Sequence, residues 1–264
     1  MEWVLIYLVV GALVGFLAGL LGIGGGLVMV PSLTYIFSAQ HFPPEHLLHL
    51  ALGTALASIM FTSVSSLRAH HQHGAVEWRI VRSMSPGIIV GTLSGSLLAS
   101  KLSSSALAIF FAVFVYYAAT QMLIEIKPKP ARQFPGRLGM TAAGGVIGLV
   151  SSLVAIGGGV LSVPFMIYCN VRAHHAIGTS SAIGFPIAAS GALGYIISGY
   201  FQQNLPHLSL GFVYLPALLW LVLASMLTAP LGAKLAHRLP VARLKKIFAL
   251  LLFIVATHML TGLL

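Results

Sequence analysis

The chain has 264 residues, of which 58% are hydrophobic and only 7% are charged. Because so few charged side chains cannot cover a water-soluble surface, this composition predicts a polytopic α-helical membrane protein and excludes an ordinary soluble domain. The net charge of +10 comes from 14 Lys and Arg against four Glu, but the basic residues gather in a few loops, which is typical of membrane orientation and argues against nucleic acid as a partner.

The first apolar stretch, residues 3–38, is too long for one crossing of about 20 residues. It contains Gly24, Gly25 and Gly26 in a row, with Pro31 five residues later. Glycine has a low helix preference, so the run should break the helix and expose backbone N–H groups inside the membrane. A short arm of about a dozen residues follows, too short to cross the bilayer again.

Three apolar runs of spanning length follow, at 47–67, 83–100 and 104–125. The first begins with ALGTALAS at 51–58, where Thr54 and Ser58 start a hydroxyl stripe that continues through Thr62 and Ser65 at helical spacing. In the second, Gly87, Gly91 and Gly95 recur every four residues, which predicts a groove for helix packing.

After a basic linker at 126–136, the second half repeats the first. The stretch 137–170 contains Gly157, Gly158, Gly159 and Pro164, each 133 residues after its counterpart in the first glycine run. Such a constant offset indicates an internal duplication, with residues 1–125 and 137–264 as the two transmembrane repeats.

The second repeat continues with three more runs of spanning length, at 176–199, 209–233 and 244–263. The first of these contains AIGTSSAI at 176–183, which matches ALGTALAS and supplies Thr179, Ser180 and Ser181. Pro186 removes a helical hydrogen bond and is expected to shape this helix, as Pro31 and Pro164 shape the short arms.

Loop charges decide how the glycine-broken stretches cross the membrane. If each stretch is a hairpin without net crossing, the basic loops at 68–82, 127–137 and 234–246 and Arg172 fall on one side, as cytoplasmic loops do. Each half is then a hairpin plus three crossings, so the halves are inverted repeats and both termini face outward from the inner or plasma membrane. Full crossing and re-entry of the hairpins both remain open.

The glycine runs place helix N-termini, with unpaired N–H groups and partial positive charge, inside the membrane. Such ends suit an anion, and hydroxyls can complete its binding shell. No Asp or Glu lies deep in a predicted span, so we expect no carboxylate-built cation site, and the sequence predicts no resident metal or cofactor. The candidate substrate-binding residues are Gly24, Gly25, Gly26, Thr54, Ser58, Gly157, Gly158, Gly159, Thr179 and Ser180.

Two other chemistries are weaker alternatives. His70, His71 and His73 could suggest a divalent-metal path, but they fall in a basic loop or helix end, where solvated histidines are commoner. Ser190 beside Gly191 could suggest an intramembrane hydrolase, but no histidine is placed to activate the serine. We therefore expect no catalytic residue.

The paired segments GIGGG at 22–26 with VPSL at 30–33, and AIGGG at 155–159 with VPFM at 163–166, resemble the TauE/SafE family of membrane transporters, the sulfite exporter group. The resemblance spans nearly the whole chain and implies transport of sulfite, sulfoacetate or another small anion by alternating access at a midplane site. It carries the repeated motif onto the two glycine triplets, Pro31 and Pro164. An anion channel or facilitator is the alternative, and a coupling proton or sodium ion and a homo-oligomer are left open.

Overall fold

The computed structural model describes residues 2–21, 25–124, 134–236 and 241–261, and these are almost entirely helical, which confirms the predicted all-α membrane fold. In chain order the elements are α1 (Glu2–Leu21), α2 (Gly26–Ala39), α3 (Leu47–Gln72), α4 (Trp78–Ala99), α5 (Ser104–Ile124), α6 (Arg137–Val154), α7 (Gly159–Tyr168), α8 (Ala173–Gly199), β1 (Ser209–Leu210), β2 (Val213–Tyr214), α9 (Leu215–Ala236) and α10 (Val241–Thr261). Gly24 and most of the predicted linker at 126–136 lie outside the described residues.

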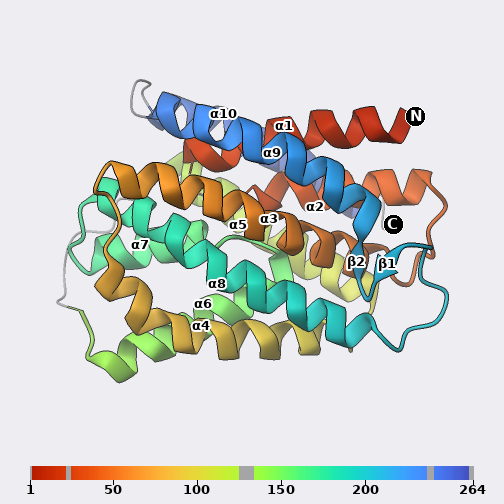
Figure 1. Ribbon diagram of the computed structural model, residues 1–264, viewed down its shortest axis with the longest axis horizontal. Helices are drawn as coiled ribbons and strands as arrows, with labels where there is room; N and C mark the ends of the chain where they lie inside the picture. The colour runs from red at the N-terminus through yellow and green to blue at the C-terminus, as the bar shows by residue number, and fades with distance from the viewer. Residues whose placement is uncertain (1, 22–24, 125–133, 237–240, 262–264) are drawn as a thin grey trace.

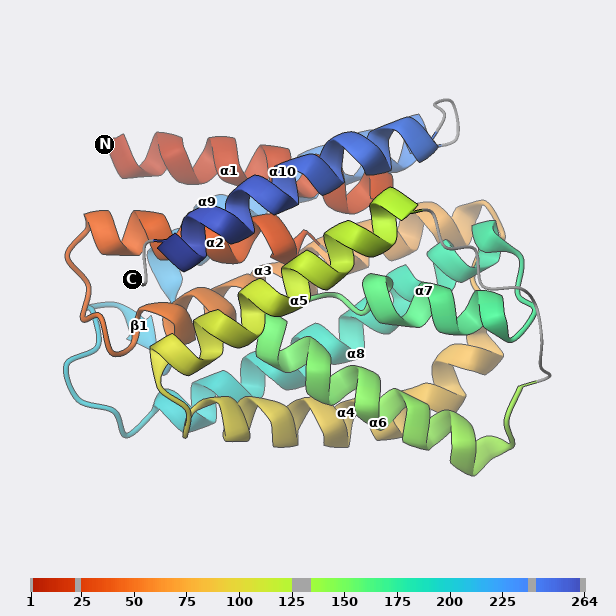
Figure 2. The ribbon, with the colours of Figure 1, turned by 180° about the vertical axis from the view of Figure 1, so that it is seen from behind.

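Both glycine-broken stretches fold back on themselves. In Figure 1, α1 runs from the N-terminal end of the bundle toward the opposite end and α2 returns, whereas α6 and α7 form a hairpin that opens at the other end. The view from behind in Figure 2 shows the same two reversals. The returning arms are short, with 14 residues in α2 and 10 in α7.

The ends of the bundle differ in charge. The helix ends that carry Arg68, Arg79, Arg137 and Lys234 all lie on the left in Figure 1, and the connection with Arg172 lies there too. The loops at 40–46 and 200–208, which have no Lys or Arg, lie at the opposite end with both termini. The basic segments that the structure describes therefore share one end of the bundle, apart from Lys101 between α4 and α5.

Helix packing is exchanged between the two halves. Helix α1 packs along α9, and α6, its counterpart in the second half, packs along α4, while α3 and α8 pack against each other. The small-residue groove on α4 serves this packing as predicted, because a Cβ at Gly87 or Gly91 would overlap backbone carbonyls of α6. Exchanged packing is the pattern that two related halves would produce, and the inverted repeat itself stays a prediction.

Six helices of the described chain are long and apolar enough to cross a bilayer by length and composition, namely α1, α3, α5, α6, α8 and α9. Large apolar side chains point outward from them, including Val113 (60% exposed) and Leu227 (75% exposed). Such exposure is unfavourable in water and natural in lipid.

The boundaries of several predicted spans need correction. Helix α4, predicted as a crossing at 83–100, is not among the six, and it carries Arg79 and Arg82 in its first turns besides the Gly and Ser that pack on α6. The predicted crossing at 244–263 is not among them either, because within α10 only Lys246–Leu260 counts, as a shorter apolar helix. The predicted span at 209–233 starts too early: residues 209–214 form the antiparallel ribbon β1–β2, with Gly211 in the left-handed region (φ 55°) at its turn. A count of apolar residues does not separate such a ribbon from the helix that follows.

Candidate functional site

The two glycine runs form equivalent turns at the starts of the short helices. Gly25 precedes α2 with φ 72°, and Gly158 precedes α7 with φ 81°, both in the left-handed region that side-chain-bearing residues rarely adopt. Neither helix has a side-chain cap at this end. Their first backbone N–H groups therefore have no partner within the helix and face the turn.

The two turns meet in the interior of the protein. A Cβ at Gly26 would overlap the backbone carbonyl of Ala155, so the start of α2 lies directly against the turn that ends α6. Ala155 itself has φ 49° and is fully buried. The side chain of Ile59 on α3 lies beside the same contact.

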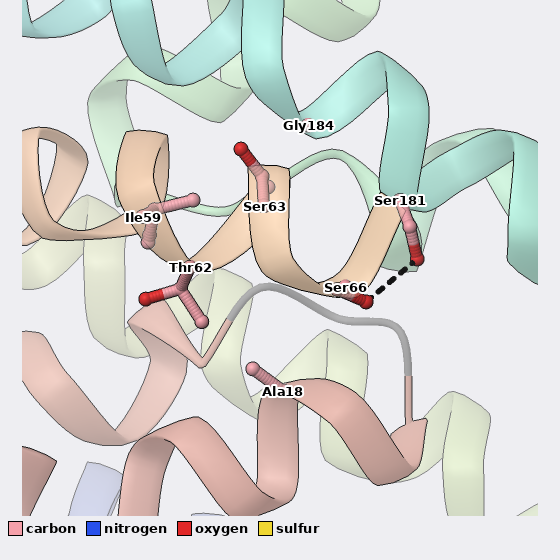
Figure 3. A pocket seen from close by; sticks show the side chains of 8 residues that line it. Ala18, Ile59, Thr62, Ser63, Ser66, Ser181 and Gly184 are labelled. Carbon is pink, nitrogen blue, oxygen red and sulfur yellow. Dashed lines mark hydrogen bonds between the residues drawn. The ribbon is translucent and has the colours of Figure 1, made fainter. Parts of the chain in front are cut away.

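A small cavity of about 20 Å³ lies next to this contact. Figure 3 shows hydroxyl groups around it, from Thr62, Ser63 and Ser66 on α3 and from Ser181 on α8. The remaining lining residues are Ala18, Ile59, Gly157 and Gly184. A volume of this size holds about one water molecule.

The hydroxyls at the cavity hydrogen-bond to neutral partners. Ser66 donates to Ser181 over 3.3 Å, Thr62 pairs with Ser225 of α9 at 2.9 Å, and Ser63 donates to the carbonyl of Met60 at 2.8 Å. None of the described lining residues is ionisable. Because a hydroxyl rotates freely and is both donor and acceptor, these groups can turn toward a guest without a buried charge.

Several buried hydroxyls have no hydrogen-bond partner among the described residues, including those of Ser58 on α3, Ser151 on α6 and Ser162 on α7. Ser162 lies one turn after Gly158, and its N–H is bonded to the carbonyl of that glycine at 2.7 Å. A buried hydroxyl left without a partner is uncommon and calls for an explanation, such as water or a ligand.

The structure does not bring Thr54 and Thr179 into the cavity. The Thr54 hydroxyl accepts the backbone N–H of Tyr214, and the Thr179 hydroxyl accepts that of Glu77, each at 2.9 Å. Each threonine lies near the start of its helix, and α3 and α8 start at opposite ends of the bundle (Figure 1). Ser180 is buried next to Thr179 and does not line the cavity either.

The glycine before each threonine packs against the same segment that the threonine binds. A Cβ at Gly53 would overlap the carbonyl of Phe212, and a Cβ at Gly178 would overlap the carbonyl of Ala75. In both cases a backbone carbonyl packs against the glycine, and the N–H group two residues later in the same segment donates a hydrogen bond to the threonine. The Gly-Thr pairs therefore hold the chain just before α9 and α4 in place.

The three prolines predicted to shape helices all lie inside helices. Pro31 and Pro164 occupy the same place in α2 and α7, five residues after Gly26 and Gly159. Pro186 lies in the middle of α8, and its carbonyl accepts the hydroxyl of Ser190 at 2.6 Å. The hydroxyl of Ser190 is thus bound to its own helix.

Ser63 and Ser66 line the cavity but were not among the residues predicted from the sequence. The signal was present, because Ile59, Thr62, Ser63 and Ser66 follow the three- and four-residue spacing of one helix face. The predicted stripe through Thr54, Ser58, Thr62 and Ser65 shares only Thr62 with the cavity lining. Ser65 points away from the cavity and donates to the carbonyl of Met226 over 3.3 Å.

Within the part of the chain that the structure describes, no three His, Cys, Asp or Glu side chains gather closely enough to hold a metal ion. His71 contacts Trp78 at the basic end of the bundle, and His175 lies 3.0 Å from the carboxylate of Glu77.

Comparison with known proteins gives a match over nearly the whole chain. The family model described as sulfite exporter TauE/SafE matches residues 7–259. The chain is 40% identical over 258 residues to a probable membrane transporter protein of Haemophilus influenzae, covering 97% of this chain and 98% of that protein. It is 28% identical to the probable membrane transporter protein YdhB of Bacillus subtilis, covering 88% and 90%. No solved structure shows a significant match.

Proposed function

The chain belongs to the sulfite exporter TauE/SafE family and is a membrane transporter, and we propose that it exports a small anion, sulfite or an organosulfonate such as sulfoacetate, by alternating access around the two glycine turns. The observation that carries this proposal is the contact between the turns at Gly26 and Ala155, beside a cavity lined by neutral hydroxyls. Gly157 lines this cavity, and Gly25, Gly26, Gly158 and Gly159 belong to the two turns at the starts of α2 and α7.

Charge favours an anion as the substrate. The starts of α2 and α7 carry the partial positive charge of a helix N-terminus, and hydroxyl groups can donate hydrogen bonds to oxyanions. The described lining residues include no carboxylate to attract a cation and no Lys or Arg to retain an anion too tightly. Such a site would bind moderately, as a transporter that must release its substrate requires.

The size of the cavity favours a carrier over an open channel. A space of about 20 Å³ holds one water molecule but not a sulfite ion, which has four heavy atoms. An anion can then enter only if helices around the cavity move apart. The short helices α2 and α7, each with an internal proline, are the elements that we expect to move.

The charge difference between the two ends of the bundle supports a membrane orientation. We place the basic end in the cytoplasm and both termini outside, in the inner or plasma membrane, because cytoplasmic loops carry the excess of Lys and Arg. Gln203→Cys and Gly74→Cys, made separately in whole cells, test this placement. A membrane-impermeant maleimide should label the first and not the second, and labelling of Gly74→Cys alone would reverse the orientation.

Sulfite flux in reconstituted vesicles tests the transport proposal. A carrier gives saturable flux and counterflow, whereas rates far above conformational turnover, without saturation, would establish the channel alternative. Imposed proton and sodium gradients in the same vesicles identify a coupling ion. The substrate class is wrong if neither sulfite nor sulfoacetate is transported while another solute is.

The cavity hydroxyls provide a sharper version of this experiment. Ser66→Ala and Ser181→Ala each remove one neutral hydrogen bond, which is worth about 0.5–1.5 kcal/mol, so the apparent KM for sulfite should rise by roughly two- to tenfold. Ser65→Ala is the matched control, because that hydroxyl faces Met226 and not the cavity. If Ser66→Ala and Ser181→Ala have the same KM as Ser65→Ala, the cavity does not bind the transported anion.

A further inference from the structure

A basic groove lies where α4 and α6 begin, at the basic end of the bundle and away from the glycine turns. It has a volume of about 1120 Å³. Its walls come from the first turns of α4 and α6, the segment 134–136 and the connection before α8. Four arginines line it: Arg79, Arg82, Arg137 and Arg172.

The positive charge of this groove is poorly balanced by acidic groups. Glu77 is the one carboxylate among the described lining residues, and it lies 3.0 Å from the ring of His175. Arg172 in turn lies 3.0 Å from the other ring nitrogen of that histidine. Within the described chain, His175 is the only basic side chain within salt-bridge distance of a carboxylate, so Arg79, Arg82 and Arg137 form no salt bridge with a described carboxylate.

Apolar side chains share the groove with the arginines. Ile80, Met140 and Val171 contribute to its lining, and Phe134 is 40% exposed at its edge. Just outside, Trp78 is 39% exposed and Leu138, next to Arg137, is 88% exposed. Tryptophan is enriched where the headgroups of a bilayer begin, so this mixture places the groove at the boundary between lipid tails and headgroups.

We propose that this groove binds the phosphate headgroup of an anionic phospholipid. The guanidinium groups match phosphate oxygens in charge and geometry, and the apolar lining suits the glycerol and the first carbons of the acyl chains. Basic pockets between helix ends on the cytoplasmic side bind such headgroups in other membrane proteins.

The groove is separate from the proposed transport site. No described residue lines both the groove and the hydroxyl cavity. Helix α8 contributes His175 to the groove and Ser181 to the cavity, and the segment docked on Gly178 and Thr179 closes the space near the start of this helix. Lipid binding can therefore be measured without any transport assay.

The test uses the purified full chain and native mass spectrometry with phosphatidylglycerol and phosphatidylcholine supplied at equal concentration. We expect a clear preference for phosphatidylglycerol. The double variant Arg79→Gln/Arg137→Gln should bind it at least tenfold more weakly, since each basic residue near a membrane surface contributes a several-fold gain for anionic lipid. Equal binding of the two lipids by the unmodified protein would overturn the proposal, whatever the variants do.

The matched control is Arg68→Gln/Lys234→Gln, which removes the same charge at the same end from a different hollow, between α3 and α9. This control should keep the preference for phosphatidylglycerol, and an equal loss would show that net charge alone attracts the lipid. A second arm adds 10 mM inorganic phosphate. If phosphate displaces phosphatidylglycerol or raises the melting temperature as much, the groove is a site for soluble anions and the lipid assignment is wrong.

Discussion

The two repeated motifs of this chain, the glycine runs and the Gly-Thr pairs, are placed differently in the fold. The glycine turns converge, because Gly26 at the start of α2 lies against Ala155 at the end of α6. The Gly-Thr pairs diverge, because Thr54 holds the segment before α9 and Thr179 holds the segment before α4, near opposite ends of the bundle. Both motifs are duplicated, yet only the first comes together beside a cavity.

Duplication alone therefore does not identify a ligand site. A feature repeated in two related halves can lie near the axis that relates them, where the copies meet, or far from it, where each copy performs the same structural task separately. Hydroxyl groups are especially easy to misassign, because a threonine that anchors a backbone N–H and a serine that faces a cavity look alike in the sequence.

Substitution at the contact between the turns should have the largest effect. Gly26→Ala places a methyl group against the carbonyl of Ala155, which is backbone and cannot move aside. Overpacking in a dense interior costs typically about 1–3 kcal/mol, and we expect the upper part of this range together with loss of sulfite flux. The melting temperature in detergent and the flux in vesicles check the two effects.

Gly145→Ala is the control for this substitution, since it adds the same methyl group to α6, where the carbonyl of Gly87 lies at an ordinary contact distance of 3.6 Å. It should change the melting temperature little. Should Gly26→Ala behave like Gly145→Ala in both assays, the turns do not meet as closely as described.

Much of this arrangement could be predicted from the sequence. Three adjacent glycines followed by a proline have no common packing role in an apolar helix, so the break, the short returning arm and the equivalence of Gly25 with Gly158 followed directly. The loop charges favoured hairpins over single crossings for the same stretches.

The cavity lining could not be predicted in the same way, because it depends on partners far away in the chain. Thr54 is anchored by Tyr214, which is 160 residues away, and Thr179 by Glu77, which is 102 residues away. A helical wheel offers several hydroxyl stripes on α3. Only the position of α1, α8 and the second turn shows that the stripe with Ser63 and Ser66 faces the interior space.

Substitution of the two anchoring threonines should have a smaller effect than Gly26→Ala, and it distinguishes anchoring from substrate binding. Thr54→Val and Thr179→Val keep the shape of the side chain but leave the N–H of Tyr214 or Glu77 without its acceptor. Both hydrogen bonds are partly buried, and the net loss of such a bond costs about 0.5–1.5 kcal/mol, so both variants should unfold at a lower temperature. Because neither threonine lines the cavity, the apparent KM for sulfite should stay unchanged in the protein that remains folded.

Thr34→Val is the matched control for this pair, because its hydroxyl bonds only to the carbonyl of Val30 in its own helix, where the carbonyl already accepts a helical N–H. We expect a much smaller change in its melting temperature. A threonine that only anchors a loop affects folding, whereas one that binds the anion affects affinity. The assignment of Thr54 and Thr179 to the scaffold is therefore wrong if Thr54→Val or Thr179→Val raises the KM for sulfite without lowering the melting temperature. The difference between the two readouts, and not the loss of activity alone, therefore assigns each repeated residue to the scaffold or to the site.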